Sequence, residues 1–222
     1  MDLNAIFKAY DVRGIVPDQL DAEAARRIGS AFARFAAAPA IAVGRDCRES
    51  SPGLAAALIS GITAEGVEVK DLGMITTDMV YFAAGHLDMP GAMITASHNP
   101  KGYNGIKFCR QGAAPVGAES GLMDIRDLAA AGTGGSGDAA AEAVDLLDDY
   151  VDHVTSVVNV ERINPLRVAA DGGNGVAGVA VPRVFERLPA ELVGLYMDPD
   201  GTFPNHNPDP LRPENLADIE RL

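Results

Sequence analysis

Residues 39–73 read PAIAVGRDCRESSPGLAAALISGITAEGVEVKDLG and contain a strand pattern, a helix pattern and a second strand pattern. The segment 39–46 is short and apolar and leads into a polar loop, which is typical of a buried strand. The helix would begin with Ser51 as its cap, directly before a proline, and would end at Gly66 in a left-handed cap. The segment 67–73 is again a strand pattern. This order of elements predicts an α/β fold.

The same alternation runs through most of the chain. Each expected helix places apolar residues three or four apart on one face, and each expected strand is a short apolar run. The strand that begins at 105 follows Asn104-Gly105, a dipeptide typical of a tight turn. We therefore expect helices over 21–37 (capped by Asp21), 77–87, 122–128, 144–158 and 176–188, strands over 91–97, 105–110, 167–170 and 191–197, and the start of an amphipathic helix in 213–222.

A boundary between two units is expected near residues 132–141, GTGGSGDAAA, where small and flexible residues replace the apolar patterns. A chain of 222 residues is long enough for one large or two small domains. We predict a first domain over 1–135 and a second over 142–222. The second would end inside a helix, so we expect the chain to be the N-terminal portion of a longer protein.

Composition excludes several classes of protein. The chain has 18 Lys and Arg against 31 Asp and Glu, and the net charge of −13 disfavours binding to nucleic acid or to an anionic membrane. Its two cysteines are too few for a disulfide scaffold and lack the spacing of metal ligands. No apolar run is long enough to span a membrane, and the N-terminus has no signal sequence. We expect a soluble, cytoplasmic protein.

The densest polar cluster is TASHNPKGYNGIK, residues 95–107, directly after an expected strand. Ligand sites in open α/β sheets lie outside the carboxyl ends of strands. A hydrolase nucleophile elbow would need glycine where this chain has Thr95 and Asn99, so acyl transfer by Ser97 is disfavoured. A serine hydroxyl among Lys and Arg side chains is suited to holding a phosphoryl group. The structural alternative is a serine that shapes a turn.

These residues closely resemble the phosphoserine loop of the α-D-phosphohexomutase superfamily. The segments 7–14 (FKAYDVRG), 44–48 (GRDCR), 171–175 (DGGNG) and 199–210 resemble further motifs of that family in order and spacing. The forms AYDVRG and GYNGIKF are most similar to its phosphomannomutase/phosphoglucomutase branch. The resemblance implies mixed-sheet α/β domains of the phosphohexomutase type, the first complete and the second incomplete.

The resemblance also implies an activity, the interconversion of 1-phospho and 6-phospho forms of mannose or glucose. Ser97 would give its phosphoryl group to the sugar phosphate, and the bisphosphosugar intermediate would return its other phosphoryl group to Ser97. Lys107 resembles a general acid/base, which requires a depressed pKa that cationic neighbours can provide. His98 would orient the phosphoserine. The resemblance further implies substrate- or phosphate-binding roles for Tyr10, Arg13 and Asn99, and the alternative for Asn99 and Asn104 is that they shape the loop.

Mg²⁺ and a hexose 1,6-bisphosphate activator follow from the same resemblance. The family binds Mg²⁺ through an Asp-Gly-Asp-Gly-Asp-Arg loop that this chain lacks, so an oxygen of phosphorylated Ser97 is the only expected metal contact. The partner would be a small sugar phosphate. The oligomeric state stays open.

Several of these residues also have structural readings. Tyr10 could be a half-buried aromatic residue of the core, and Arg13 could form a surface ion pair with Asp11. Lys107 could be the solvent-facing member of an alternating strand. Arg45 and Arg48 could brace the loop around Asp46, the acidic segment 145–152 reads as a solvated helix face, and His206-Asn207-Pro208 reads as a turn.

Two other functions are compatible with parts of the sequence. Residues 173–178 match G-x-G-x-x-G after an expected strand, and Asp198 follows about 20 residues later, as in NAD-binding oxidoreductases. That reading explains one motif and leaves the others unexplained. A truncated homologue that binds ligand without catalysing a reaction is the third interpretation.

Overall fold

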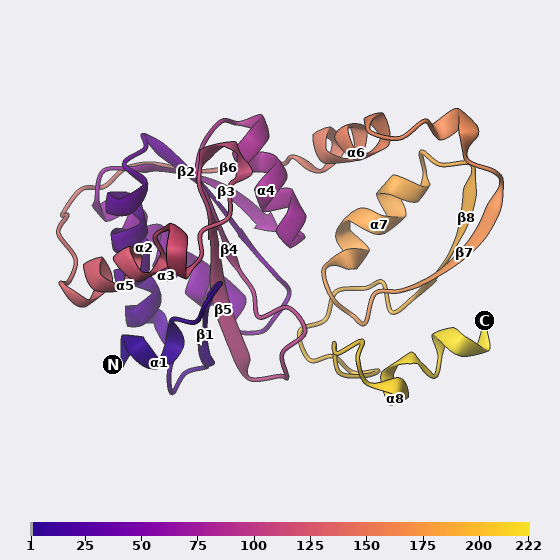
Figure 1. Cartoon of the computed structure of the whole chain (residues 1–222), viewed down its shortest axis with the longest axis horizontal. Helices are drawn as coiled ribbons and strands as arrows, with labels where there is room; N and C mark the ends of the chain where they lie inside the picture. The colour runs from indigo at the N-terminus through magenta and orange to yellow at the C-terminus, as the bar shows by residue number, and fades with distance from the viewer. Residues whose placement is uncertain (1) are drawn as a thin grey trace.

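The structure is a computed structural model that describes residues 2–222, and its central element is a six-stranded mixed sheet (Figure 1). The strand order is β1-β5-β4-β2-β3-β6. Strands β4, β2, β3 and β6 are parallel, whereas β5 is antiparallel to both β4 and β1. The expected mixed-sheet α/β class is confirmed. The strands are β1 (Val12–Ile15), β2 (Ala40–Arg45), β3 (Glu68–Met74), β4 (Gly91–Ile94), β5 (Tyr103–Cys109) and β6 (Ala141–Ala143).

Helices cover both faces of this sheet (Figure 1). One face packs against α1 (Leu3–Ile6), α2 (Ala22–Ala36), α3 (Ser51–Ala64) and α5 (Leu122–Ala130), and α4 (Thr77–His86) packs on the other. The expected apolar face of α2 is confirmed, because Ile28 and Phe32 are fully buried and the Phe32 ring lies 4.5 Å from that of Phe108. Asp21 caps α2 by accepting a hydrogen bond from the Ala24 N–H at 2.7 Å.

The start of α3 differs from the sequence-based expectation by one residue. Ser50, not Ser51, is the N-cap, and it makes no side-chain cap hydrogen bond. Ser51 lies inside the helix and is buried, with its hydroxyl donating to the Asp46 carboxylate. The Ser51 hydroxyl, which the sequence pattern assigned to capping, therefore binds the buried Asp46 carboxylate instead. Gly66 follows the end of the helix with φ +79°, as expected.

The turn expected at Asn104-Gly105 is wrong. Both residues lie inside β5, where Gly105 is opposite Arg13 on β1. The chain reverses earlier, where the Tyr103 N–H donates to the Pro100 carbonyl at 3.2 Å and Gly102 has φ +93°. Position 105 requires glycine because a Cβ atom there would lie 2.3 Å from the Val12 carbonyl oxygen on the neighbouring strand.

Gly105→Ala should therefore destabilise the protein by about 3 kcal/mol or more, since a backbone oxygen cannot move aside without disturbing the β1–β5 pairing. Urea denaturation measures this. Gly53→Ala is the matched control, because its Cβ would meet no atom within 4 Å and alanine is the better helix former, by up to about 1 kcal/mol. Equal stability of the two variants would contradict the explanation.

The segment 132–141, expected to be flexible, is held on the first sheet. The N–H groups of Gly134 and Gly135 donate to the Glu65 carboxylate at 3.1 and 2.9 Å, and Gly137 donates to the Ala64 carbonyl at 2.7 Å. The chain then forms β6 along the exposed edge of β3. The small residues of this segment show no strand pattern. Its pairing with β3 therefore depends on an edge strand that is distant in the sequence and that the local sequence does not reveal.

The second part of the chain, beyond α4 in Figure 1, holds a two-stranded parallel sheet with helices beside it. It comprises α6 (Leu147–Ser156), β7 (Leu166–Asp171), α7 (Ala177–Phe185), β8 (Ala190–Leu195) and α8 (Pro213–Leu216). Leu146 and Ala180 are buried in one apolar cluster with Met79 and Val80 of α4, so the two parts share a packed contact. Single 3₁₀ turns cover Gln111–Ala113, Ala118–Ser120, Val160–Arg162 and Ile219–Arg221.

Three helix predictions in this part are wrong at their ends, and the helix expected over 176–188 is the shorter α7. The helix expected over 144–158 is α6, which is shorter because the Asp145 carboxylate accepts from the Leu147 N–H at 2.9 Å and sets its start. The helix expected to begin in 213–222 is only α8 and a separate 3₁₀ turn. Within residues 2–222, no helix is both long enough and apolar enough to cross a membrane.

Candidate active site

The Ser97 loop, defined here as residues 95–102, joins β4 to β5 at the carboxyl end of β4. Ser97 is exposed and has φ +50°, a left-handed conformation that non-glycine residues rarely adopt. Its N–H donates to the buried Thr95 hydroxyl at 2.9 Å, and the Asn99 N–H donates to the Ala96 carbonyl at 3.0 Å. Backbone strain of this kind is typical of functional sites. The loop thus holds one serine hydroxyl outward in a conformation with an energetic cost.

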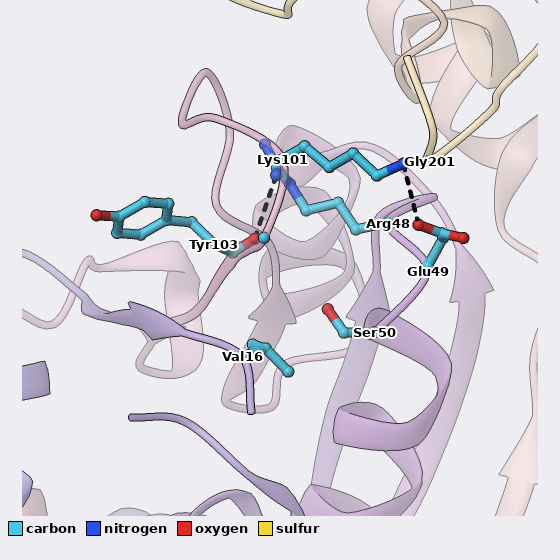
Figure 2. Close-up of a pocket in the computed structure, with 8 residues that line it drawn as sticks. Val16, Arg48, Glu49, Ser50, Lys101, Tyr103 and Gly201 are labelled. Carbon is cyan, nitrogen blue, oxygen red and sulfur yellow. Dashed lines mark hydrogen bonds and ion pairs between the residues drawn. The ribbon is translucent and has the colours of Figure 1, made fainter. Parts of the chain in front are cut away.

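Arg48 determines the shape of this loop. Its side chain is buried, and its two terminal nitrogens donate to the carbonyls of Ser97 (2.8 Å), Asn99 (2.6 Å), Pro100 (3.1 Å) and Tyr103 (3.2 Å). Figure 2 shows the bond to Tyr103. Arginine is suited to this because its planar guanidinium presents several donors in fixed directions. The expected bracing role of Arg48 is confirmed, and it extends to carbonyls around the serine.

A carboxylate network fixes Arg48 in turn. Asp46 is buried and accepts the Arg48 N–H at 3.0 Å, while its other oxygen lies 3.4 Å from Arg48 Nε. Burial lowers the pKa of the Arg48 guanidinium, and the Asp46 charge opposes that shift. Asn104 Nδ2 donates to the hydroxyls of Ser50 and Ser51, both at 2.9 Å. This network connects the ends of β2 and β5 with the start of α3.

A second carboxylate brings two of the expected site residues together. Asp11 is buried, and its Oδ2 atom contacts Arg13 Nη2 at 2.8 Å and Lys107 Nζ at 2.9 Å. Arg13 Nη1 also lies 3.4 Å from Asn99 Oδ1, which links the pair to the Ser97 loop. The Arg13–Asp11 ion pair is present, but the expectation that it lies on the surface is wrong, because its carboxylate is buried. The position of Asp11 between two cations was not anticipated, although it lies inside the motif 7–14.

The side chain of Lys107 is not a plain solvent-facing member of β5. Its ammonium group binds a buried carboxylate and shares one oxygen atom of it with Arg13. The strand register explains why Lys107 contacts Asp11. Ile106 on β5 is opposite Val12, the first residue of the antiparallel β1, so the next residue of β5, Lys107, lies beside Asp11, which directly precedes β1.

Tyr10 and His98 lie on open surface. Tyr10 is 81% exposed, so the alternative that it is a half-buried residue of the core is wrong. Among residues 2–222, no hydrogen bond joins Tyr10 to the Ser97 loop. His98 is exposed and lines a cavity of about 310 Å³ together with Asn207, Asp209 and Arg212. The Ser97 loop therefore faces the second part of the chain across a polar cleft.

A smaller cavity of about 190 Å³ lies beside the same loop (Figure 2). Lys101 Nζ lies 3.4 Å from the Glu49 carboxylate at its rim, as Figure 2 shows. Gly201 reaches this cavity from the second part of the chain. The remaining lining residues are Val16, Arg48, Ser50, Gly102 and Tyr103.

The glycines of 173–178 have structural explanations. Gly173 has φ +52°, and a Cβ atom there would lie 3.2 Å from the His206 ring, which covers the loop. A Cβ atom on Gly178 would lie 1.6 Å from the Met197 carbonyl oxygen. Because the His206 ring covers the loop on which the phosphates of a dinucleotide would bind, the dinucleotide-binding interpretation is not favoured.

His206 and Asp171 form a half-buried pair at 3.1 Å between Nε2 and Oδ2. Burial alone would lower the pKa of His206, but hydrogen bonds to the Asn207 carbonyl and the Asp171 carboxylate outweigh it and raise the pKa. Folding thus favours protonated His206. Its contribution to stability is complete below the unfolded pKa of about 6.5 and is lost as pH rises through the raised pKa of the folded state.

We expect the free energy of unfolding to fall as pH rises through that window. Denaturant titrations at a series of pH values measure this. In His206→Gln this component of the pH dependence should vanish, and an unchanged pH profile in that variant would contradict the assignment.

The described residues do not fit a Mg²⁺ site. No group of three or more His, Cys, Asp and Glu side chains in residues 2–222 could hold a metal ion. Near Ser97, the Asp11 and Asp46 carboxylates already bind cationic side chains. In the acidic segment 145–152, Asp148 and Asp152 form ion pairs with Arg183 and Arg187 on the surface.

Comparisons with known proteins agree along nearly the whole chain. The family model "Phosphoglucomutase/phosphomannomutase, alpha/beta/alpha domain I" matches residues 4–132, and the corresponding model of domain II matches residues 148–222. The resemblance seen in the sequence, including its branch, is confirmed.

Individual relatives are similar over the same range. A protein named "Phosphohexose mutases" from Xanthomonas campestris is 44% identical over 94% of this chain and 47% of its own length. A phosphomannomutase/phosphoglucomutase from Pseudomonas aeruginosa is 41% identical over 97% of this chain and 46% of its own length. The crystal structure of a phosphoglucomutase/phosphomannomutase family protein from Burkholderia thailandensis superposes with a TM-score of 0.89 at 39% identity, covering 99% of this chain and 50% of that one. The chain spans about half the length of the curated relatives it matches.

Proposed function

The chain belongs to the phosphoglucomutase/phosphomannomutase family, and from that premise we propose that its native protein interconverts 1-phospho- and 6-phosphohexoses through a phosphorylated Ser97. The observation that carries this proposal is the geometry of one hydroxyl. Ser97 is exposed and strained, and Arg48 holds its carbonyl. Asn99 of the same loop contacts Arg13, which shares the Asp11 carboxylate with Lys107. Phosphoryl transfer depends chiefly on positioning and on stabilisation of charge, and this arrangement supplies both.

The reaction begins with phosphorylated Ser97. The bond between phosphorus and Ser97 Oγ breaks as phosphorus bonds to the free hydroxyl oxygen of a hexose monophosphate. The hydroxyl proton passes to a base, and the departing Ser97 Oγ takes up a proton to become a hydroxyl. The bisphosphosugar then reorients and returns its other phosphoryl group to Ser97. The second transfer reverses the first, so the serine is phosphorylated again when the isomer leaves.

Lys107 is our proposal for the acid/base, and Arg13 and Asn99 for contacts to phosphate oxygens. Lys107 and Arg13 are held by one buried carboxylate, so neither needs to be ordered when the substrate arrives. Arginine can bind two phosphate oxygens at once. His98, at the mouth of the polar cleft, would orient the phosphoryl group, and Tyr10 would contact substrate from open surface.

Other parts of the proposal rest on family membership. We propose mannose or glucose phosphates as substrates, a hexose 1,6-bisphosphate as activator, and a cytoplasmic location. Mg²⁺ would contact an oxygen of phosphorylated Ser97, and no step is assigned to it because the described residues provide no ligand cluster. Domains over 1–135 and 142–222 are also proposed, with β6 of the connecting segment paired to the first sheet.

The test is to locate the phosphoryl group. The native protein is incubated with glucose 1,6-bisphosphate and examined by intact mass and peptide mapping. We expect one added phosphoryl group, on Ser97. Ser120, whose hydroxyl is engaged in a turn, is the internal control and should stay unmodified. Stable phosphorylation of another residue would overturn the assignment of Ser97. Binding of the bisphosphate without any transfer would favour a non-catalytic homologue instead.

A further inference from the structure

We propose that Arg48 is a positioning residue through which Phe203, in the second part of the chain, controls the conformation of the Ser97 loop. The consequence for catalysis rests on the proposed function, whereas the coupling between the two segments does not. Arg48 and Phe203 are far apart in the sequence, and the guanidinium carbon of Arg48 lies 5.1 Å from the centre of the Phe203 ring.

One side of the Arg48 guanidinium binds the Ser97 loop. Its two terminal nitrogens donate four hydrogen bonds, three to carbonyls of the loop, including that of Ser97, and one to the carbonyl of Tyr103 directly after it. Hydrogen bonds to a charged donor are stronger than neutral ones. A small displacement of the guanidinium would therefore move several carbonyls together and change the direction of the Ser97 hydroxyl.

The other side of Arg48 is in contact with the segment 201–203. A Cβ atom on Gly201 would lie 2.3 Å from the Cys47 carbonyl oxygen and 2.8 Å from Arg48 Cα, so the backbones approach at a distance that only glycine permits. Cys47 Sγ lies 3.4 Å from the Asn174 carbonyl oxygen, a second contact between the same two parts. Phe203 has φ +50°, a strained conformation in which its ring rests over the guanidinium.

The guanidinium is also incompletely satisfied. Among residues 2–222, the buried Arg48 Nε has no hydrogen-bond partner, and its ion-pair partner, the Asp46 carboxylate, is 3.4 Å away. A buried charge with an unmet donor is costly as a purely structural element. The Phe203 ring adds cation–π attraction to the ion pair with Asp46, so the position of Arg48 depends on the second part of the chain as well as on its own carboxylate.

The coupling is measured by NMR-detected hydrogen exchange of the loop amides Ser97, Asn99 and Tyr103. Phe203→Leu removes the aromatic face and keeps an apolar side chain, and we expect exchange at these amides to quicken by roughly 3- to 10-fold. Phe203→Tyr restores the ring and should restore slow exchange. Leu211→Ala is the matched control, because Leu211 lies in the same part of the chain, is 86% exposed, and should leave the loop unchanged when replaced.

Arg48→Lys keeps the charge but cannot reach four carbonyls, so it should quicken exchange more than Phe203→Leu does. Faster exchange in Arg48→Lys with no change in Phe203→Leu would show that Arg48 only braces its own domain, and the coupling would be refuted. If the exchange results hold, Phe203→Leu should lower kcat more than it raises KM, with recovery in Phe203→Tyr. Coupled exchange without an effect on kcat would leave the coupling intact and refute its consequence for catalysis, whereas a native protein without any mutase activity would contradict the proposed function.

Discussion

Ser97→Ala should abolish turnover in the native protein, with a loss in kcat of about 10⁴-fold or more, the scale seen when a nucleophile that forms a covalent intermediate is removed. No other hydroxyl can replace it, because the Arg48 bonds and the left-handed backbone place only this one outward on the loop. The measurement is a coupled assay of glucose 1-phosphate conversion in the presence of a bisphosphate activator.

Ser97→Gly separates chemistry from folding. Glycine adopts φ +50° without strain, so Ser97→Gly should be more stable than Ser97→Ala by about 1 kcal/mol, and equally inactive. Thermal denaturation gives the stability and the coupled assay gives the activity. Activity that follows stability across the two variants would mean that the loop conformation matters and the hydroxyl does not.

Lys107→Met should reduce kcat by roughly 10²- to 10⁴-fold, the usual contribution of an acid/base group. Methionine keeps the length of the side chain and loses the ammonium group that contacts Asp11 at 2.9 Å. KM should change far less, because the phosphate contacts proposed for Arg13 and Asn99 remain. Steady-state kinetics on the purified variant measure both quantities.

Asp11→Asn is the companion variant for Lys107. It keeps the shape of the side chain but removes the charge that holds Lys107 and Arg13 on one oxygen atom. If the position of the Lys107 ammonium group is what matters for catalysis, kcat should fall in this variant although both cations are present.

Near-normal kcat in Lys107→Met with a strongly raised KM would make Lys107 a substrate-binding charge instead of an acid/base.

Local patterns predicted the elements that depend on local chemistry. The cap at Asp21, the buried face of α2 and the left-handed Gly66 were all predicted from residues within one or two helical turns. Motif resemblance predicted the family, because the motifs are spread along the chain at family spacing. The functional roles of the individual site residues stay predictions.

The errors have a common physical origin. Asn104-Gly105 has the composition of a tight turn, yet Gly105 is required by the approach of Val12 from another strand. The segment 132–141 has the composition of a linker, yet its backbone donors meet the Glu65 carboxylate and β6 meets the edge of β3. In both cases the deciding partner is distant in the sequence.

The amino-acid sequence by itself therefore determined the α/β class, most helices and strands, and the family, since periodicity, capping and motif spacing are properties of neighbouring residues. Only the tertiary structure decided which charges meet. Asp11 joins Arg13 to Lys107 because β1 pairs with β5 in one register, and Arg48 reaches four carbonyls because β2 ends beside β4. Ion pairs and hydrogen bonds act over a few ångströms, so the contacts at this site follow from strand register and packing and cannot be derived from sequence distance.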